Sequence, residues 1–276
     1  MKIVFANPSH PTSGVVVAFA TEGARLTASG IALDKMTKGA LTRAIKGSRF
    51  KGKNGQSLTV MTPSDSKLNR VLLMGLGKPK DINDLRMQGL GGKIQANIAG
   101  SGQTSASVMV DAVDGGGLSA TSMAANVAYG ARLRAYRFDK YRTKESADAK
   151  PSLKTLRVMC KASARAKAAF LPMDKVADGV CMTRDLVSEP PNVIFPQSLA
   201  KKARELSKLG VKVEVLGEAQ MRKLGMGALL GVGQGSARES QMVVMRWNGA
   251  QAGQGRGKGA EPIAFVGKGV DRKSVV

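Results

Sequence analysis

Short apolar runs alternate with amphipathic stretches over positions 1–160 of the chain. The unbroken apolar run at 14–20 is typical of a strand buried on both faces, whereas the spacing of apolar residues within 81–99 is typical of a helix. We expect one side of that helix to carry Leu85, Leu90, Ile94 and Ile98. The other expected strands lie at 3–6, 57–63, 69–78, 106–113 and 153–160, and a second helix lies at 121–136.

This alternation of strands and helices predicts an α/β domain with a mainly parallel sheet. The polar segment 139–152 is expected to form a surface loop near the end of that domain. Residues 162–190 follow a helical pattern that the double proline at 190–191 ends. We therefore expect a first domain at 1–160, a linker helix at 161–190 and a second domain at 191–276.

The second region has fewer elements. The segment 196–210 is amphipathic and is bounded by a proline and a glycine, which predicts a helix. The apolar run 241–247 predicts a buried strand, and so does 262–268, which ends in a lysine between two glycines. Shorter expected elements are a strand at 211–216, a helix at 218–225 and a glycine-rich connection at 250–262.

The composition adds a strong positive charge to this picture. The 276 residues carry 43 Lys and Arg against 20 Asp and Glu, which gives a net charge of +23. Such a surface attracts phosphate backbones without sequence preference. The chain has only one Trp, three Tyr and seven Phe, and no strand is rich in aromatic residues that could stack on bases. A solvated basic surface is favoured, with non-specific nucleic-acid binding as the alternative.

The sequence predicts no contact with membranes. It has no apolar run long enough to cross a bilayer, and its first residues lack the apolar core and cleavage site of a signal peptide. Cys160 and Cys181 are too few for a disulfide framework, and we expect both to be small, buried apolar side chains. These features predict a cytoplasmic protein.

Several motifs lack a residue that their chemistry requires. The segment 231–236 ends in serine where a dinucleotide fingerprint needs glycine, and 75–80 lacks two required positions of a phosphate-binding P-loop. We expect tight turns at both. His10 is the only histidine, so a Ser-His-Asp triad or a histidine-based zinc site would depend on it alone. A surface turn is its expected place.

Polar side chains also gather around the double proline. Arg184 and Asp185 are expected to cap or pair at the end of a helix. Asn192 is expected to accept N–H bonds in the turn before the next helix.

Lys268 is the sharpest candidate for a functional residue. It is the last residue of the expected strand 262–268 and lies at its carboxyl edge, where open α/β sheets place their ligand sites. From the residues alone it could be a surface charge, an anion-binding group or, less often, a metal ligand. A lysine binds a metal only through its neutral amine.

The chain resembles the leucyl aminopeptidases, the cytosol aminopeptidase family of two-metal exopeptidases. The motifs that carry the resemblance span nearly residues 1–270. They are LDKMTKGALTRAI (33–45), RVLLMGLGK (70–78), YRFDKYRTK (136–144), RDLVSEPPNVIFPQSLA (184–200), VKVEVLGEAQMRKLGMGALLGVGQGS (211–236), VVMRWNG (243–249) and PIAFVGKG (262–269).

This resemblance implies a fold and a function. The fold is α/β, with a macro-like first domain followed by the incomplete start of an α/β/α catalytic domain. The activity is removal of N-terminal residues, leucine preferred, from peptides, by a hexamer.

The resemblance also implies a metal site. Two divalent ions, manganese or zinc, activate a bridging water, and Lys268 matches the family's metal-binding lysine. A second lysine and an arginine further along help to stabilise the tetrahedral intermediate.

The sequence departs from the family pattern just after Lys268. The family has a metal-bridging aspartate five residues after its lysine, and this place is Lys273 here. Asp271 is two positions early, and we do not assign it the role. The catalytic residues and the other ligands are thus expected beyond Val276, and we expect this chain to be inactive by itself. A further hypothesis is that the final segment 271–276 is foreign to the gene.

Overall fold

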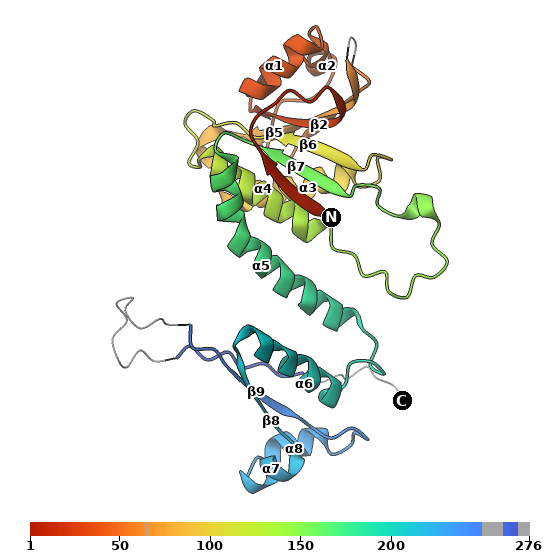
Figure 1. The fold of residues 1–276 in the computed structure, drawn as a ribbon, viewed down its shortest axis with the longest axis vertical. Helices are drawn as coiled ribbons and strands as arrows, with labels where there is room; N and C mark the ends of the chain where they lie inside the picture. The colour runs from red at the N-terminus through yellow and green to blue at the C-terminus, as the bar shows by residue number, and fades with distance from the viewer. Residues whose placement is uncertain (64–65, 250–261, 270–276) are drawn as a thin grey trace. The chain divides into compact units, whose positions relative to one another are not determined.

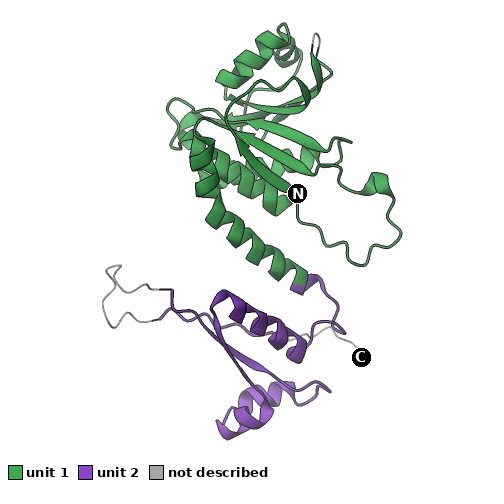
Figure 2. Ribbon diagram, in the orientation of Figure 1, with its two compact units in different colours: residues 1–185 green, residues 186–276 purple. Residues whose placement is uncertain are grey.

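The computed structural model describes residues 1–63, 66–249 and 262–269. The chain divides into two compact units, residues 1–185 and residues 186–276 (Figures 1 and 2). The division falls near the end of the helix α5 (Ser163–Ser188), which occupies the place expected for a linker helix. Most of α5 therefore belongs to the first unit.

The first unit is built on a seven-stranded, mainly parallel sheet, as predicted. Its strand order is β1-β7-β6-β2-β5-β4, and β3 pairs with β2. All pairs are parallel except β2–β3 and β4–β5, which are antiparallel. The strands are β1 (Lys2–Ala6), β2 (Ser13–Thr21), β3 (Arg25–Leu26), β4 (Ser57–Met61), β5 (Lys67–Gly77), β6 (Ser105–Met109) and β7 (Thr155–Met159).

Helices cover both faces of this sheet, and the side chains of β2 show why. Val15, Val17 and Phe19 point into the apolar core beneath α3, α4 and the start of α5. Val16 and Ala18 point into the core beneath α1 and α2. Because successive residues of a strand face opposite sides, an unbroken apolar run is what a strand between two helical layers requires. These helices are α1 (Ala28–Met36), α2 (Ala40–Lys46), α3 (Asp84–Ile98) and α4 (Ala120–Arg134).

The helix α3 begins where Asn83 accepts a hydrogen bond from the backbone N–H of Arg86 at 3.0 Å. Its buried side contains Leu90 and Ile98, as predicted. The prediction was wrong for Leu85, which is 79% exposed. Leu85 lies five positions before Leu90, or about 1.4 helical turns, so the two side chains face different directions. Met87 takes the inward position instead.

The predicted surface loop at 139–152 is confirmed, and it contains only a short 3-10 turn, Ala147–Ala149. Another 3-10 turn, Pro79–Asp81, follows β5. The segment 75–80 is therefore the end of a strand and a short turn rather than a phosphate-binding loop. Within the described ranges, no helix combines the length and the apolar character needed to cross a membrane.

The second unit contains a small antiparallel sheet of β8 (Lys212–Leu216) and β9 (Met242–Arg246), in which Val213 pairs with Met245. The helix α6 (Pro196–Glu205) packs on both strands. It continues as the 3-10 turn Leu206–Leu209 and ends at Gly210, whose φ is 88°. The left-handed conformation favours glycine, so this end follows the prediction.

Two predictions for the second unit were wrong. The strand β9 forms, but its side chains are half-buried or exposed, because the described part of this sheet has only two strands. The segment 231–236 is not simply a tight turn, because residues 231–233 complete the helix α8 (Gly227–Gly233). The helix expected at 218–225 forms as α7 (Glu218–Lys223).

Candidate functional site

Lys268 lies in a segment that was predicted to be a buried strand but is not one. Residues 262–269 form neither a strand nor a helix, and all are exposed. The apolar side chains before the lysine are open to solvent, with Phe265 94% and Val266 97% exposed. A buried strand needs neighbouring strands to pair its backbone and a layer to cover its side chains, and the two described strands of the small sheet do not supply them here.

The described residues do not by themselves build a site for two metal ions. Nowhere in these ranges do three His, Cys, Asp or Glu side chains gather closely enough to hold a metal. Two described acids of the second unit have other partners: Glu218 accepts a bond from the backbone N–H of Ser240 at 2.9 Å, and Glu214 lies 3.9 Å from Arg246. Two divalent ions side by side need several carboxylates to balance their charge, and Lys268 offers a single amine.

The predictions made for the residues that flank this segment lie outside the described residues. They concern the glycine-rich connection at 250–261 and the positions Asp271 and Lys273. The predicted site is therefore represented in the structure by Lys268 and the seven residues around it.

The histidine and the two cysteines singled out in the sequence lie in no group of three metal-binding side chains among the described residues. His10 is exposed in an irregular segment, as predicted. Cys160 is buried, as predicted, and burial raises the pKa of its thiol. Cys181 was expected to be buried too, but it is partly exposed because it lies on the second half of α5.

Arg184 and Asp185 do not bond to each other in these contacts. Each bonds at or just after the end of α4, so the predicted interaction at a helix end is made there. Arg184 Nη1 donates to the carbonyl oxygen of Leu133 at 2.7 Å, and Asp185 Oδ1 accepts from the Tyr136 hydroxyl at 2.9 Å. In the turn before α6, the bonds expected of Asn192 are made by Ser198 instead. Its Oγ accepts from the N–H of Phe195 at 2.9 Å and donates to the carbonyl of Val193 at 2.8 Å.

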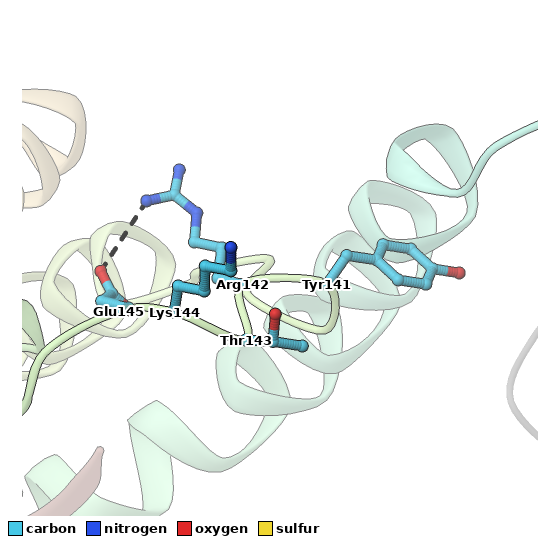
Figure 3. A pocket seen from close by; sticks show the side chains of 5 residues that line it. All are labelled: Tyr141, Arg142, Thr143, Lys144 and Glu145. Atoms are coloured by element: carbon cyan, nitrogen blue, oxygen red, sulfur yellow. Dashed lines mark ion pairs between the residues drawn. The ribbon is translucent and has the colours of Figure 1, made fainter.

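A shallow hollow in the first unit is lined by Tyr141, Arg142, Thr143, Lys144 and Glu145 (Figure 3). Tyr141 points away from the pair of Arg142 and Glu145. The Arg142 guanidinium lies 3.8 Å from Glu145. Glu145 is itself bound by the guanidinium of Arg137, and its Oε2 atom is buried with no hydrogen-bond partner in the described ranges. The only carboxylate that lines this hollow, Glu145, is thus already paired with two arginines, so the lining does not form a set of metal ligands.

The Arg137–Glu145 pair leads to a pH prediction. The hydrogen bond from Arg137 holds the pKa of Glu145 below its ordinary value, and Arg137 and Arg142 lower it further by their charge. The stabilisation is present above the ordinary glutamate pKa of about 4.3 and is lost as pH falls through the lowered value. A side-chain carboxyl NMR titration should therefore place the midpoint of Glu145 below about 4.3.

The Arg137→Gln variant should raise that midpoint. Arg165→Gln, which removes an exposed arginine of α5, is the matched control and should leave it unchanged. An ordinary or raised midpoint for Glu145 in the unaltered chain would contradict the role of the ion pair.

The sequence matches two models of one family in order along the chain. The N-terminal domain of the cytosol aminopeptidase family matches residues 15–145, and the catalytic domain of the same family matches residues 181–272. A probable cytosol aminopeptidase from Bradyrhizobium sp. is 43% identical over 273 residues, and one from Caulobacter vibrioides is 42% identical over 273 residues. These alignments cover 98% of this chain but 52% and 53% of those proteins.

Solved structures show the same fold. A mutant of tomato leucine aminopeptidase superposes with a TM-score of 0.72 at 22% identity, covering 88% of this chain and 50% of that one. The bottromycin maturation enzyme BotP, in complex with Mn, superposes with a TM-score of 0.64 at 24% identity, covering 85% of this chain and 45% of that one.

These comparisons agree with the architecture. The first family model lies within the first unit, and the second extends over nearly all of the second unit and includes Lys268. The chain spans about half the length of the curated relatives that it matches. It belongs to the cytosol aminopeptidase family.

Proposed function

We propose that this chain supplies the first half of a metal-dependent aminopeptidase that removes N-terminal residues, leucine preferred, from peptides. The observation that carries the proposal is the match of both family models, in family order, to one chain that is 43% identical to a probable cytosol aminopeptidase over 98% of its length. The fold shared with tomato leucine aminopeptidase supports it.

Within this proposal, Lys268 contributes one ligand to a site for two divalent ions. The second family model includes this lysine, and the sequence around it, PIAFVGKG, has the family pattern. The described residues do not complete such a site. The other ligands and the catalytic groups are therefore assigned to the part that the relatives have in addition. Manganese and zinc are the proposed metals, and manganese is the ion named for the BotP complex.

The proposed setting follows the family. The relatives are called cytosol aminopeptidases, which supports a cytoplasmic location, and peptides are the proposed substrates. A hexamer is proposed from the resemblance alone. The alternative of a DNA-binding protein rests only on the net charge of +23, and none of the names reported above refers to nucleic acid.

Two purified proteins test the proposal. The first is this chain, which should not hydrolyse leucine p-nitroanilide above the buffer blank with either Mn²⁺ or Zn²⁺ in excess. The second is a fusion of residues 1–269 to the corresponding remainder of the Bradyrhizobium relative, which should hydrolyse it. Hydrolysis by the chain alone would refute the proposal that its metal site is incomplete. A folded, metal-loaded fusion without activity would refute the assignment of this chain to an active aminopeptidase.

A further inference from the structure

The helix α5 consists of two halves that are held in different ways. In the first half, Ala166 and Phe170 are buried in the core beneath the sheet. Ala177 is the last buried residue, and from 178 to 188 every position is half-buried or exposed. Figure 1 shows the second half extending past the sheet of the first unit. Apolar burial therefore stabilises α5 as far as Ala177 and contributes little beyond that residue.

The second half is also a weak helix by its own sequence. Pro172 lies inside α5 and has no N–H to donate to the preceding turn. Gly179 follows seven residues later, with open space where a side chain would be. A glycine in a helix interior costs about 1 kcal/mol relative to alanine. Other interactions must therefore keep residues 173–188 helical.

One set of these interactions joins two carboxylates of α5 to a single arginine of α4. Asp174 and Asp178 lie one turn apart on the same side of α5. The Nε atom of Arg132 lies 3.4 Å from Asp174 Oδ1, and its Nη2 atom lies 3.2 Å from Asp178 Oδ1. The Arg132 side chain is 27% exposed, so this pairing is partly shielded from solvent. Lys175 also pairs with Asp178 at 3.2 Å along the helix.

A second set lies one to two turns further along. The hydrogen bonds of Arg184 to the Leu133 carbonyl and of Asp185 to the Tyr136 hydroxyl connect this end of α5 to the end of α4. The Arg184 guanidinium also lies 5.4 Å from the centre of the Tyr136 ring. Cation–π attraction at a partly exposed site adds to the hydrogen bonds.

We propose that these contacts form a latch that keeps residues 173–188 helical and held to α4, with Pro172 as the hinge at which the segment is released. The latch consists of Arg132 and Tyr136 on one side and Asp174, Asp178, Arg184 and Asp185 on the other. Because it is made of charges and not of buried apolar surface, salt weakens it while leaving the core intact. It controls the segment through which the chain leaves its first unit, whether or not a metal is bound.

Hydrogen exchange of the whole chain, read by mass spectrometry, tests the latch. The Arg132→Gln variant should raise exchange in peptides covering 173–188 by about tenfold, since two partly shielded ion pairs are lost together. Peptides from α3 and β2 should keep their protection. In the unaltered chain, 1 M salt should produce the same local change to a smaller extent.

Two further variants decide the result. Arg165→Gln removes an arginine from the first half of the same helix and should change nothing in 173–188. The double variant Arg132→Asp with Asp174→Arg restores an opposite-charge pair and should recover part of the protection. Wild-type exchange in 173–188 for Arg132→Gln would overturn the proposal. So would a rise that spreads equally over α3 and β2, because that would show loss of global stability.

Discussion

The Lys268→Ala variant of the fusion is expected to hydrolyse leucine p-nitroanilide at least about 100-fold more slowly than the parent fusion. Loss of a group that only orients a metal ligand costs 10- to 100-fold in metal affinity or activity, so loss of a ligand should cost no less. The expected cause is weaker metal binding. Metal content after dialysis, measured by mass spectrometry, should therefore fall together with the rate.

Lys223→Ala is the matched control for that variant. Lys223 is an exposed lysine of α7 in the same unit, and its removal changes the net charge equally. We expect its rate and metal content to equal those of the parent fusion. A Lys268→Ala fusion with the parent rate and full metal content would remove Lys268 from the proposed site and leave it as a surface charge.

The Gly130→Ala variant is expected to lose about 3 kcal/mol in the free energy of unfolding of the first unit. Gly130 lies where α4 crosses α3, and a Cβ atom there would collide with the carbonyl group of Gln88. The backbone Cα of Gln88 would be only 2.8 Å from it. Gly91 of α3 meets the backbone of Val127 in the same way. Because both obstacles are backbone atoms, the two helices must separate to make room.

Gly89→Ala provides the control for this substitution. Gly89 is an exposed glycine of α3, and a Cβ atom there would meet no atom within 4 Å. Alanine should stabilise the helix at this position by up to about 1 kcal/mol. Exchange of the most protected amides of β2 measures both effects as changes in global unfolding. Equal stabilities for the two variants would contradict the close crossing of α3 and α4.

Most elements of the first unit could be predicted from sequence because their signals are local, but α1, α2 and β3 were not among the expected elements. The unbroken apolar run 14–20 indicates a strand that is covered on both faces. A helical spacing of apolar residues indicates a helix that is buried on one side. The phase of a helix is less certain when its apolar residues are irregularly spaced, and this explains the error at Leu85. Met87 carries the inward position that the five-residue step from Leu85 to Leu90 cannot reach.

Burial in the second unit could not be predicted from local signals. An apolar run such as 241–247 is typical of a central strand, but its burial depends on strands and helices that must lie on both sides of it. The strand β9 has one described neighbour, β8, and therefore remains half-exposed. The same reasoning applies to the exposed apolar residues before Lys268.

The candidate site was identified by a family pattern and not by its chemistry. A lysine between two glycines has no property that distinguishes a ligand from a surface charge until the surrounding motif is compared with relatives. The sequence gives even less indication of the latch contacts. Asp174 and Asp178 have the spacing of any solvated helical face, and their partner Arg132 lies on another helix, far away in the sequence.

The position of β1 in the sheet has a consequence for the order in which the chain folds. Lys2 pairs with Thr155, so β1 has no partner until β7 has been made. At the usual rates of translation, synthesis of the intervening residues takes on the order of ten seconds. The strands β2, β4 and β5 are complete once Gly77 has been added, and they can pair during that time. The strand β1 is therefore made before β2 but joins the sheet only after β7.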